Sequence, residues 1–314
     1  MRFEGGDGLT LAGTLTVPTT TDVEPPVVVM LHGSGPIDRD GNAPGLALDV
    51  FRQLADPLAQ NGIASLRYDK RGVGKSEGSF DAACMSDLVA DARSAVQFVK
   101  ARPEINSEQV FVLGHSEGGT LAQIVATRAS LAGLILIAAP AQPLGKVITW
   151  QLQQTLKEQG APDSQIESEL NKQRRFNKWV KRTEGKWGNY TLKDVQDAVP
   201  GFTAREWLSA QSFPLCWYRE HFNHDPLSTI RNIEVPVLIV HGQNDRQVPP
   251  PAAHSLAQAG KDAGNDDVQA RVFSNLNHVL RRDQDKALGN RHLDRPVDER
   301  VRQLIVGWLT EQTR

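Results

Sequence analysis

The sequence predicts an α/β fold with a mostly parallel central sheet flanked by helices, together with a helical insertion. Three observations support this fold class. Short runs that are apolar at every position recur along the chain, as in parallel strands covered on both faces. Amphipathic helical patterns lie between these runs, which is the succession of βαβ units. From about residue 141 to residue 232, the apolar runs stop and charged helical segments replace them.

The first strand is expected at residues 9–18, where apolar and polar residues alternate before a proline. This pattern predicts a half-buried antiparallel strand at an edge of the sheet. The continuously apolar runs follow it, and they predict parallel strands at residues 26–31, 64–68, 109–114, 133–139, 236–242 and 268–274.

Helical patterns fill the segments between these strands. Residues 86–101 have acidic residues early, basic residues late and one apolar stripe, which comprises Leu88, Ala92, Ala95, Val96 and Val99. Near the end of the chain, Pro296 is expected in the first turn of a last helix, whose apolar face should pack back on the sheet.

The insertion, residues 141–232, has its own helical signals. A helix is expected from Asp163, and a capping box from Thr203 to Glu206 marks the start of another. The insertion also holds five of the six tryptophans, which are Trp150, Trp179, Trp187, Trp207 and Trp217. We expect them to dock a thin helical segment on the main domain rather than to contact a ligand, although both roles can coexist.

Length and charge exclude several classes of protein. The 314 residues are enough for a large α/β domain with an insertion. A net charge of -2 gives no reason to expect nucleic acid as a partner, and no window approaches 18 uncharged apolar residues, so no membrane span is expected.

The N-terminal residues lack a signal-peptide pattern, which predicts a cytoplasmic protein, although a chain trimmed of its signal would look the same. A homo-oligomer is compatible with this composition.

The two cysteines, Cys84 and Cys216, lie far apart in the sequence and in apolar surroundings. This placement predicts buried or half-buried thiols rather than a disulfide framework or a metal site.

The strongest chemical signal is the segment "VLGHSEGG", in which an expected strand runs into Gly114, His115, Ser116, Glu117 and Gly118 before a helical pattern. The pattern G-x-S-x-G between a strand and a helix is typical of a nucleophile elbow. A serine hydroxyl is a weak nucleophile at neutral pH, so this prediction requires a histidine base and an orienting carboxylate.

Two residues that follow expected strands fit these roles. Asp245 comes after the strand at residues 236–242, and His278 comes after the strand at residues 268–274. The carboxyl ends of parallel strands are where α/β sheets place functional groups. Competing residues occupy less suitable positions in the insertion, on a helix or in a polar loop: His224, Asp225, His254 and His292. Three others are expected to be structural histidines: His32, His115 and His241.

The glycine-rich segment "HGSGPIDRDGN", residues 32–42, resembles a phosphate or calcium loop at first sight. The calcium pattern lacks the glycine required at its sixth position, which is Ala43. The separate "GVGKS" at residues 72–76 resembles the end of a P-loop, but the required first glycine is Asp69. We therefore expect neither a nucleotide nor a metal ion at these segments.

Together, the segments "HGSGPIDRDGN", "RYDKRGVGKS", "GHSEGG", "HGQNDRQVP" and "LNHVL" resemble those of α/β-hydrolase fold serine hydrolases. They are similar to bacterial carboxylesterases related to the dienelactone hydrolase and serine aminopeptidase branches. The resemblance covers residues 9–140 and 233–314 and is weak in the insertion. It implies a catalytic core formed by residues 1–140 and 233–314, with residues 141–232 as a helical cap.

The resemblance implies Ser116 as nucleophile, His278 as general base and acid, and Asp245 as orienting carboxylate, which agrees with the choice made from the residues alone. It also implies an oxyanion hole formed by the backbone N–H groups of Ser34 and Glu117.

The sequence thus predicts a cofactor-free serine carboxylesterase that hydrolyses small to medium esters through an acyl-enzyme. A serine peptidase of aminopeptidase type, a thioesterase or an acyltransferase would use the same triad, because the substrate pocket selects the leaving group. A non-catalytic binding protein of the same fold is the remaining alternative.

Overall fold

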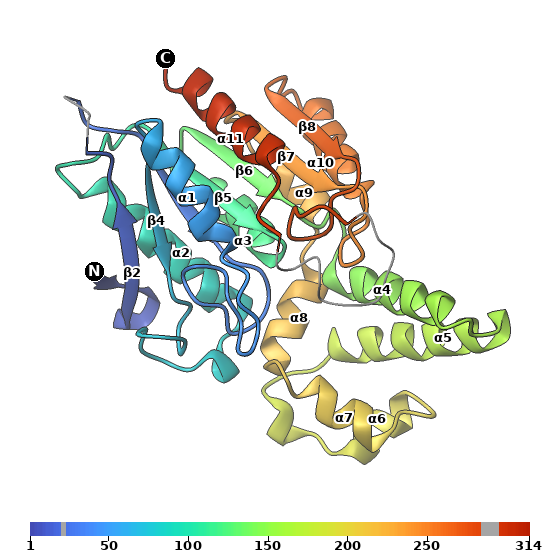
Figure 1. Cartoon of the computed structure of the whole chain (residues 1–314). Helices are drawn as coiled ribbons and strands as arrows, with labels where there is room; N and C mark the ends of the chain where they lie inside the picture. The colour runs from blue at the N-terminus through green and yellow to red at the C-terminus, as the bar shows by residue number, and fades with distance from the viewer. Residues whose placement is uncertain (20–22, 284–294) are drawn as a thin grey trace. The chain divides into compact units, whose positions relative to one another are not determined.

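The computed structural model describes residues 1–19, 23–283 and 295–314. The chain divides into two compact units (Figure 1). Unit 1 comprises Met1–Phe80, Leu88–Ala141 and Pro226–Arg314, and unit 2 comprises Asp81–Asp87 and Gln142–Asp225. None of the helices within the described residues is long and apolar enough to cross a membrane.

Unit 1 is built on a sheet with the strand order β1-β2-β4-β3-β5-β6-β7-β8. Strand β2 pairs antiparallel with β1 and β4, and the other pairs are parallel. The strands are β1 (Arg2–Glu4), β2 (Thr10–Thr16), β3 (Val27–Leu31), β4 (Ala64–Tyr68), β5 (Val110–His115), β6 (Gly133–Ile137), β7 (Val237–Gly242) and β8 (Val268–Phe273). The predicted fold class and parallel strands are confirmed.

The two edges of the sheet differ from expectation. The strand predicted at residues 9–18 is not an edge strand, because β1 pairs outside β2. Strand β1 has three residues, of which only Phe3 is buried, and so short a segment has no periodicity to read. At the other edge, β8 is only partly buried, whereas β3 to β7 are buried at nearly every position.

The helices of unit 1 include α1 and α11, which pack together in one apolar cluster against the sheet (Figure 1). The set is α1 (Val50–Gln60), α2 (Met85–Lys100), α3 (Glu117–Ala126), α9 (Pro226–Ile230), α10 (Ala252–Asp262) and α11 (Glu299–Gln312). The first three residues of α2 belong to unit 2. Helix α11 begins after Pro296, not with it in the first turn as predicted. The side chain of Asp298 accepts the N–H of Arg300 at 3.0 Å and so caps the helix there.

Unit 2 contains α4 (Leu144–Glu158), α5 (Asp163–Val180), α6 (Leu192–Ala198), α7 (Ala204–Ala210) and α8 (Leu215–Asn223). The helix expected from Asp163 is confirmed. The capping box is confirmed too, because Glu206 accepts the N–H of Thr203 at 2.7 Å and Thr203 accepts the N–H of Glu206 at 3.2 Å.

Aromatic side chains form the core of unit 2. Phe176 stacks on Phe202 with ring centres 5.1 Å apart, and Trp179 stacks on Trp187 at 6.2 Å. Trp207 packs against the same cluster. These three tryptophans are partly buried, whereas Trp217 is buried and stacks on Phe213 at 4.1 Å. Four of the five tryptophans of the insertion therefore pack within this unit, and docking on unit 1 stays a prediction for the set.

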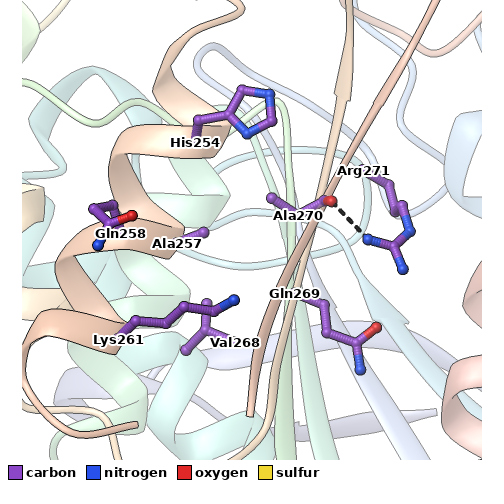
Figure 2. A pocket seen from close by; sticks show the side chains of 8 residues that line it. All are labelled: His254, Ala257, Gln258, Lys261, Val268, Gln269, Ala270 and Arg271. Carbon is purple, nitrogen blue, oxygen red and sulfur yellow. Dashed lines mark hydrogen bonds between the residues drawn. The ribbon is translucent and has the colours of Figure 1, made fainter. Parts of the chain in front are cut away.

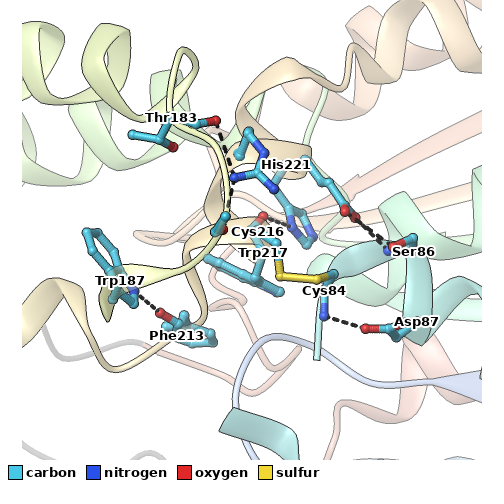
Figure 3. Close-up of a disulfide and its surroundings, with 12 residues drawn as sticks. Cys84, Ser86, Asp87, Thr183, Trp187, Phe213, Cys216, Trp217 and His221 are labelled. Atoms are coloured by element: carbon cyan, nitrogen blue, oxygen red, sulfur yellow. Dashed lines mark hydrogen bonds between the residues drawn. A yellow bond between two sulfur atoms is a disulfide. The ribbon is translucent and has the colours of Figure 1, made fainter. Parts of the chain in front are cut away.

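A disulfide joins Cys84 to Cys216 within unit 2, so the expectation of free thiols is wrong (Figure 3). The two residues are 132 positions apart, yet their Cα atoms lie 5.2 Å from each other. The segment Asp81–Asp87 lies against α8, where Glu220 also accepts the N–H of Ser86 at 2.7 Å. Local sequence context contains no signal for such a long-range contact.

Candidate active site

Ser116 lies at a strained turn between β5 and α3. Its φ of 56° and ψ of -119° are unfavourable for a residue with a side chain. Two hydrogen bonds hold this conformation: the N–H of Ser116 donates to the carbonyl of Ile137, and the carbonyl of Ser116 accepts the N–H of Gly119, each at 2.9 Å. The predicted strand–serine–helix context of an elbow is therefore present.

The two glycines of the G-x-S-x-G pattern are required by close backbone approaches. A Cβ on Gly114 would lie 2.1 Å from the carbonyl oxygen of Gly118. A Cβ on Gly118 would lie 2.1 Å from the carbonyl oxygen of Leu31. Any larger residue at either position would push α3 away from the strands that hold the serine.

Asp245 and His278 are brought together by the ends of β7 and β8. His278 Nδ1 lies 2.8 Å from Asp245 Oδ2, and both side chains are buried. The other oxygen of Asp245 accepts the N–H groups of Gln247 at 2.7 Å and Val248 at 2.9 Å. A carboxylate held in this way assigns the proton of neutral His278 to Nδ1 and leaves Nε2 as an acceptor.

Asp245 stays ionised in this setting. Burial alone would raise its pKa, but His278 and His241 outweigh burial and hold the pKa well below its usual range. His241 Nε2 lies 3.0 Å from the same oxygen that His278 contacts. A permanent negative charge next to His278 stabilises the imidazolium that a general base becomes.

His115 and His32, two of the histidines expected to be structural, both have lowered pKa values. Burial, with a smaller effect of His278, lowers the pKa of His115 to about 3, and its Nε2 lies 2.9 Å from the carbonyl oxygen of His278. Burial and Lys70 lower the pKa of His32 to about 3. Both stay neutral at physiological pH. His115 precedes Ser116 in the chain, and its ring centre is 4.8 Å from that of His278, so His278 lies beside the elbow.

The competing histidines lie elsewhere. His254 lines a pocket of about 440 Å³ between α10 and β8, together with Lys261 and Arg271 (Figure 2). None of Ser116, Asp245 and His278 lines that pocket. His224 belongs to unit 2, and His292 lies outside the described residues.

The loop after β3 runs beside the elbow because Leu31 pairs with Gly114 in adjacent parallel strands. A Cβ on Gly33 would lie 3.2 Å from the Cβ of Ser116. Within the described residues, nothing accepts the N–H of Ser34. This geometry is compatible with the predicted role of Ser34 in an oxyanion hole.

The acidic half of the same loop is held by hydrogen bonds within the loop and to Asp69. Asp38 accepts the N–H groups of Asp40 and Asn42, each at 2.9 Å. Arg39 binds both oxygens of Asp69, at 3.0 and 2.6 Å. The carboxylate of Asp40 pairs with Arg67, and no group of three or more metal-ligating side chains occurs in the described part of the chain.

The second apparent motif, "GVGKS", is a turn built around the same Asp69. Its carboxylate accepts the N–H of Lys75 at 3.0 Å, and a Cβ on Gly74 would lie 2.5 Å from it. Gly74 also has a φ of +57°. The turn is structural, as the missing P-loop glycine indicated.

Lys70 is the residue of this region that sequence reasoning missed. Its ammonium lies 2.5 Å from the carbonyl oxygen of Gly33 and 2.8 Å from Glu117 Oε2, and the side chains of Lys70 and Glu117 are both buried. The available signal was a lysine two positions after a fully buried strand, because such a side chain begins inside the protein and needs an internal partner.

Comparisons with known proteins agree with this architecture. The family model described as serine aminopeptidase, S33, matches residues 47–285. Esterase EstD of Thermotoga maritima is 28% identical over 303 residues, which are 96% of this chain, and the chain spans 66% of the length of that relative. A proline iminopeptidase of Thermoplasma volcanium is 30% identical over 175 residues, or 54% of this chain and 52% of the relative.

A solved structure extends the comparison of the fold. Est1E from Butyrivibrio proteoclasticus, with bound ferulic acid, has a TM-score of 0.63 at 18% identity and covers 100% of this chain and 99% of its own. At that identity, the likeness concerns the fold alone. Since the family model covers most of the chain, the protein belongs to the serine aminopeptidase S33 family of hydrolases and has the α/β-hydrolase fold.

Proposed function

We propose that this protein is a serine carboxylesterase with Ser116, His278 and Asp245 as its catalytic triad. The observation that carries the proposal is the 2.8 Å contact of a buried, ionised Asp245 with His278, beside a strained serine elbow. Buried carboxylate–histidine pairs next to a nucleophile are the arrangement that activates a serine hydroxyl.

In the proposed reaction, Ser116 Oγ attacks the ester carbonyl while His278 Nε2 takes its proton. The tetrahedral intermediate then expels the alcohol, which receives that proton from His278, and an acyl-serine remains. Water attacks the acyl group by the same route and releases the acid and free Ser116. Asp245 holds the ring and stabilises its charged form without taking up the proton.

The negative oxygen of the intermediate would be bound by the N–H groups of Ser34 and Glu117. Removing one such donor costs about 3 kcal/mol of transition-state stabilisation in enzymes of this type. Glu117 is the first residue of α3, so the positive end of the helix dipole adds to the same effect.

The name of one relative favours an ester as substrate, because EstD is described as an esterase. A peptidase is the second candidate, since a proline iminopeptidase also matches more than half of the chain. The preference for small to medium esters and the role of the insertion as a cap stay predictions from the sequence.

The cytoplasmic location also stays a prediction. The observation that weighs against it is the disulfide Cys84–Cys216, because structural disulfides persist mainly in oxidising compartments.

The proposal is tested by hydrolysis of p-nitrophenyl esters of increasing acyl length beside aminoacyl anilides. We expect esters to be preferred, and Ser116→Ala to lose activity by roughly 10⁴-fold or more. Ser164→Ala, at an exposed serine of α5, serves as the matched control and should behave as wild type.

Labelling with a fluorophosphonate gives a second readout, because only an activated Ser116 should react. Full ester hydrolysis by Ser116→Ala, or anilides greatly preferred over every ester, would contradict the carboxylesterase assignment.

A further inference from the structure

We propose that Lys70 is a positioning residue that holds the oxyanion hole in shape through the peptide bond between Gly33 and Ser34. This inference rests on the proposed function, because it assigns a role within the same reaction. Lys70 donates to Gly33 O at 2.5 Å and to Glu117 Oε2 at 2.8 Å. One ammonium group therefore contacts the two segments that supply both predicted N–H donors.

The sheet order explains why these groups meet. Strands β4, β3 and β5 are parallel neighbours, and their carboxyl ends lie at one edge. Lys70 follows β4, Gly33 follows β3 and Glu117 follows β5. Each residue comes two positions after its strand, so the contact is set by three neighbouring strands of the sheet.

The contact with Gly33 controls the direction of a donor. In a trans peptide, the carbonyl of one residue and the N–H of the next lie in one plane and point in opposite directions. Fixing the carbonyl of Gly33 therefore fixes the N–H of Ser34. Gly33 has no side chain to restrict this peptide, and Gly35, with a φ of +103°, follows two positions later. The orientation of the peptide therefore depends on a contact from outside the loop.

The hydrogen bond also strengthens the donor. A positive charge on the carbonyl oxygen draws electron density from the peptide, and bonds in a chain polarise one another. The N–H of Ser34 consequently binds a negative oxygen better than an unassisted amide would.

Stability does not account for the ion pair between Lys70 and Glu117. Their side chains are 4% and 2% exposed, and burying two charges costs as much as their attraction returns in many proteins. A pair of apolar residues would serve stability equally well, whereas only a charged or polar donor can hold the Gly33 carbonyl. The pair itself is neutral, so its effect is to place groups rather than to add net charge.

The test compares Lys70→Met with Lys75→Met, an exposed lysine in the following turn. Because Lys70→Met removes the charge that Glu117 contacts inside the protein, the double variant Lys70→Met/Glu117→Gln is made as well, so that a protein without either charge is available. Measurements are kcat, KM, the melting temperature and the inhibition constant of a trifluoromethyl ketone, which forms a tetrahedral adduct with a reactive serine.

We expect kcat/KM of the double variant to fall about 10- to 100-fold, less than the loss of a whole oxyanion donor, with KM changed less than about threefold. The affinity for the trifluoromethyl ketone should fall in parallel, because the adduct carries the same negative oxygen. Lys75→Met should match wild type in all four measurements.

Unchanged kcat/KM in the folded double variant would overturn the inference. So would a lowered melting temperature with unchanged ketone affinity, which is the result expected of a purely structural lysine. If Ser116→Ala keeps its activity, the proposed function itself fails. If Ser116→Ala is inactive while the Lys70 variants are unimpaired, only the role of Lys70 fails.

Discussion

The two units of this protein are stabilised in different ways. Unit 1 is held by a sheet whose central strands are buried along their whole length, and its main cluster consists largely of valine, leucine and isoleucine. Unit 2 is held by stacked aromatic rings and one disulfide. In a sheet, many small contacts fix each backbone position, so side chains at its edge can be placed with the accuracy that catalysis needs. A helical unit depends on a few large contacts.

The two units also contain ion pairs that differ in their exposure to solvent. In unit 1, the pairs Lys70–Glu117 and Arg71–Asp91 are buried, with side chains at most 6% exposed. In unit 2, a pair such as Lys193–Asp197 is 80% and 65% exposed. Exposed pairs contribute little to stability, whereas a buried charge is maintained only where the fold supplies a partner. The candidate active site lies in the unit that holds these two buried pairs.

The largest effect is expected for a variant that inactivates the candidate active site in unit 1 and leaves unit 2 folded. Asp245→Asn removes the charge that orients His278 and stabilises its protonated form, so kcat should fall by roughly 10³- to 10⁴-fold. The near-ultraviolet circular dichroism of the aromatic cluster in unit 2 should not change. Activity within tenfold of wild type would mean that another carboxylate orients the base.

The next largest effect is expected for a variant that destabilises unit 2. Cys216→Ser opens a link between residues 132 positions apart, and we expect it to lower the stability of this unit by about 2–4 kcal/mol. Denaturant unfolding followed by near-ultraviolet circular dichroism measures the change. Reductant should destabilise the wild type to the same extent and leave Cys216→Ser unaffected. If reductant does not shift the wild-type transition, the disulfide does not stabilise unit 2.

The smallest effect concerns acid stability in unit 1. Hydrogen bonds from Arg300 and Arg282 outweigh burial and hold the pKa of Asp298 well below its usual range. A carboxylate whose folded pKa is depressed stabilises the protein above its unfolded pKa, near 4, and loses that contribution as the pH falls through the folded value.

Asp298→Asn should therefore cost about 1 kcal/mol of unfolding free energy at pH 7, because asparagine can still cap the helix but loses the ion pairs with Arg300 and Arg282. The difference from wild type should shrink as the pH falls below about 4. Unfolding curves of both proteins at pH 7 and pH 3 measure it, and a difference that stays constant with pH would show that the ion pairs contribute nothing.

Much of unit 1 could be predicted because its signals are local. The parallel strands are continuous apolar runs, and the G-x-S-x-G pattern reflects approaches of Gly114 and Gly118 to backbone atoms. Asp245 and His278 could be chosen because each follows a strand, and parallel strands bring their carboxyl ends together. Strand β1 has no sequence signal because three residues show no period, and α11 begins later than predicted because Asp298 caps it.

The sequence by itself determined the succession of strands and helices along the chain. It also determined the position of the serine elbow, since the end of the strand, the turn and the start of the helix lie within about ten consecutive residues. Only the tertiary structure decided which distant groups meet. Cys84 forms a disulfide with Cys216, which is 132 positions away in the sequence. Lys70 contacts both Gly33 and Glu117 because three neighbouring strands end at the same edge of the sheet. Periodicity reports which face of an element is buried, but the partner of a buried side chain depends on the packing of the whole sheet.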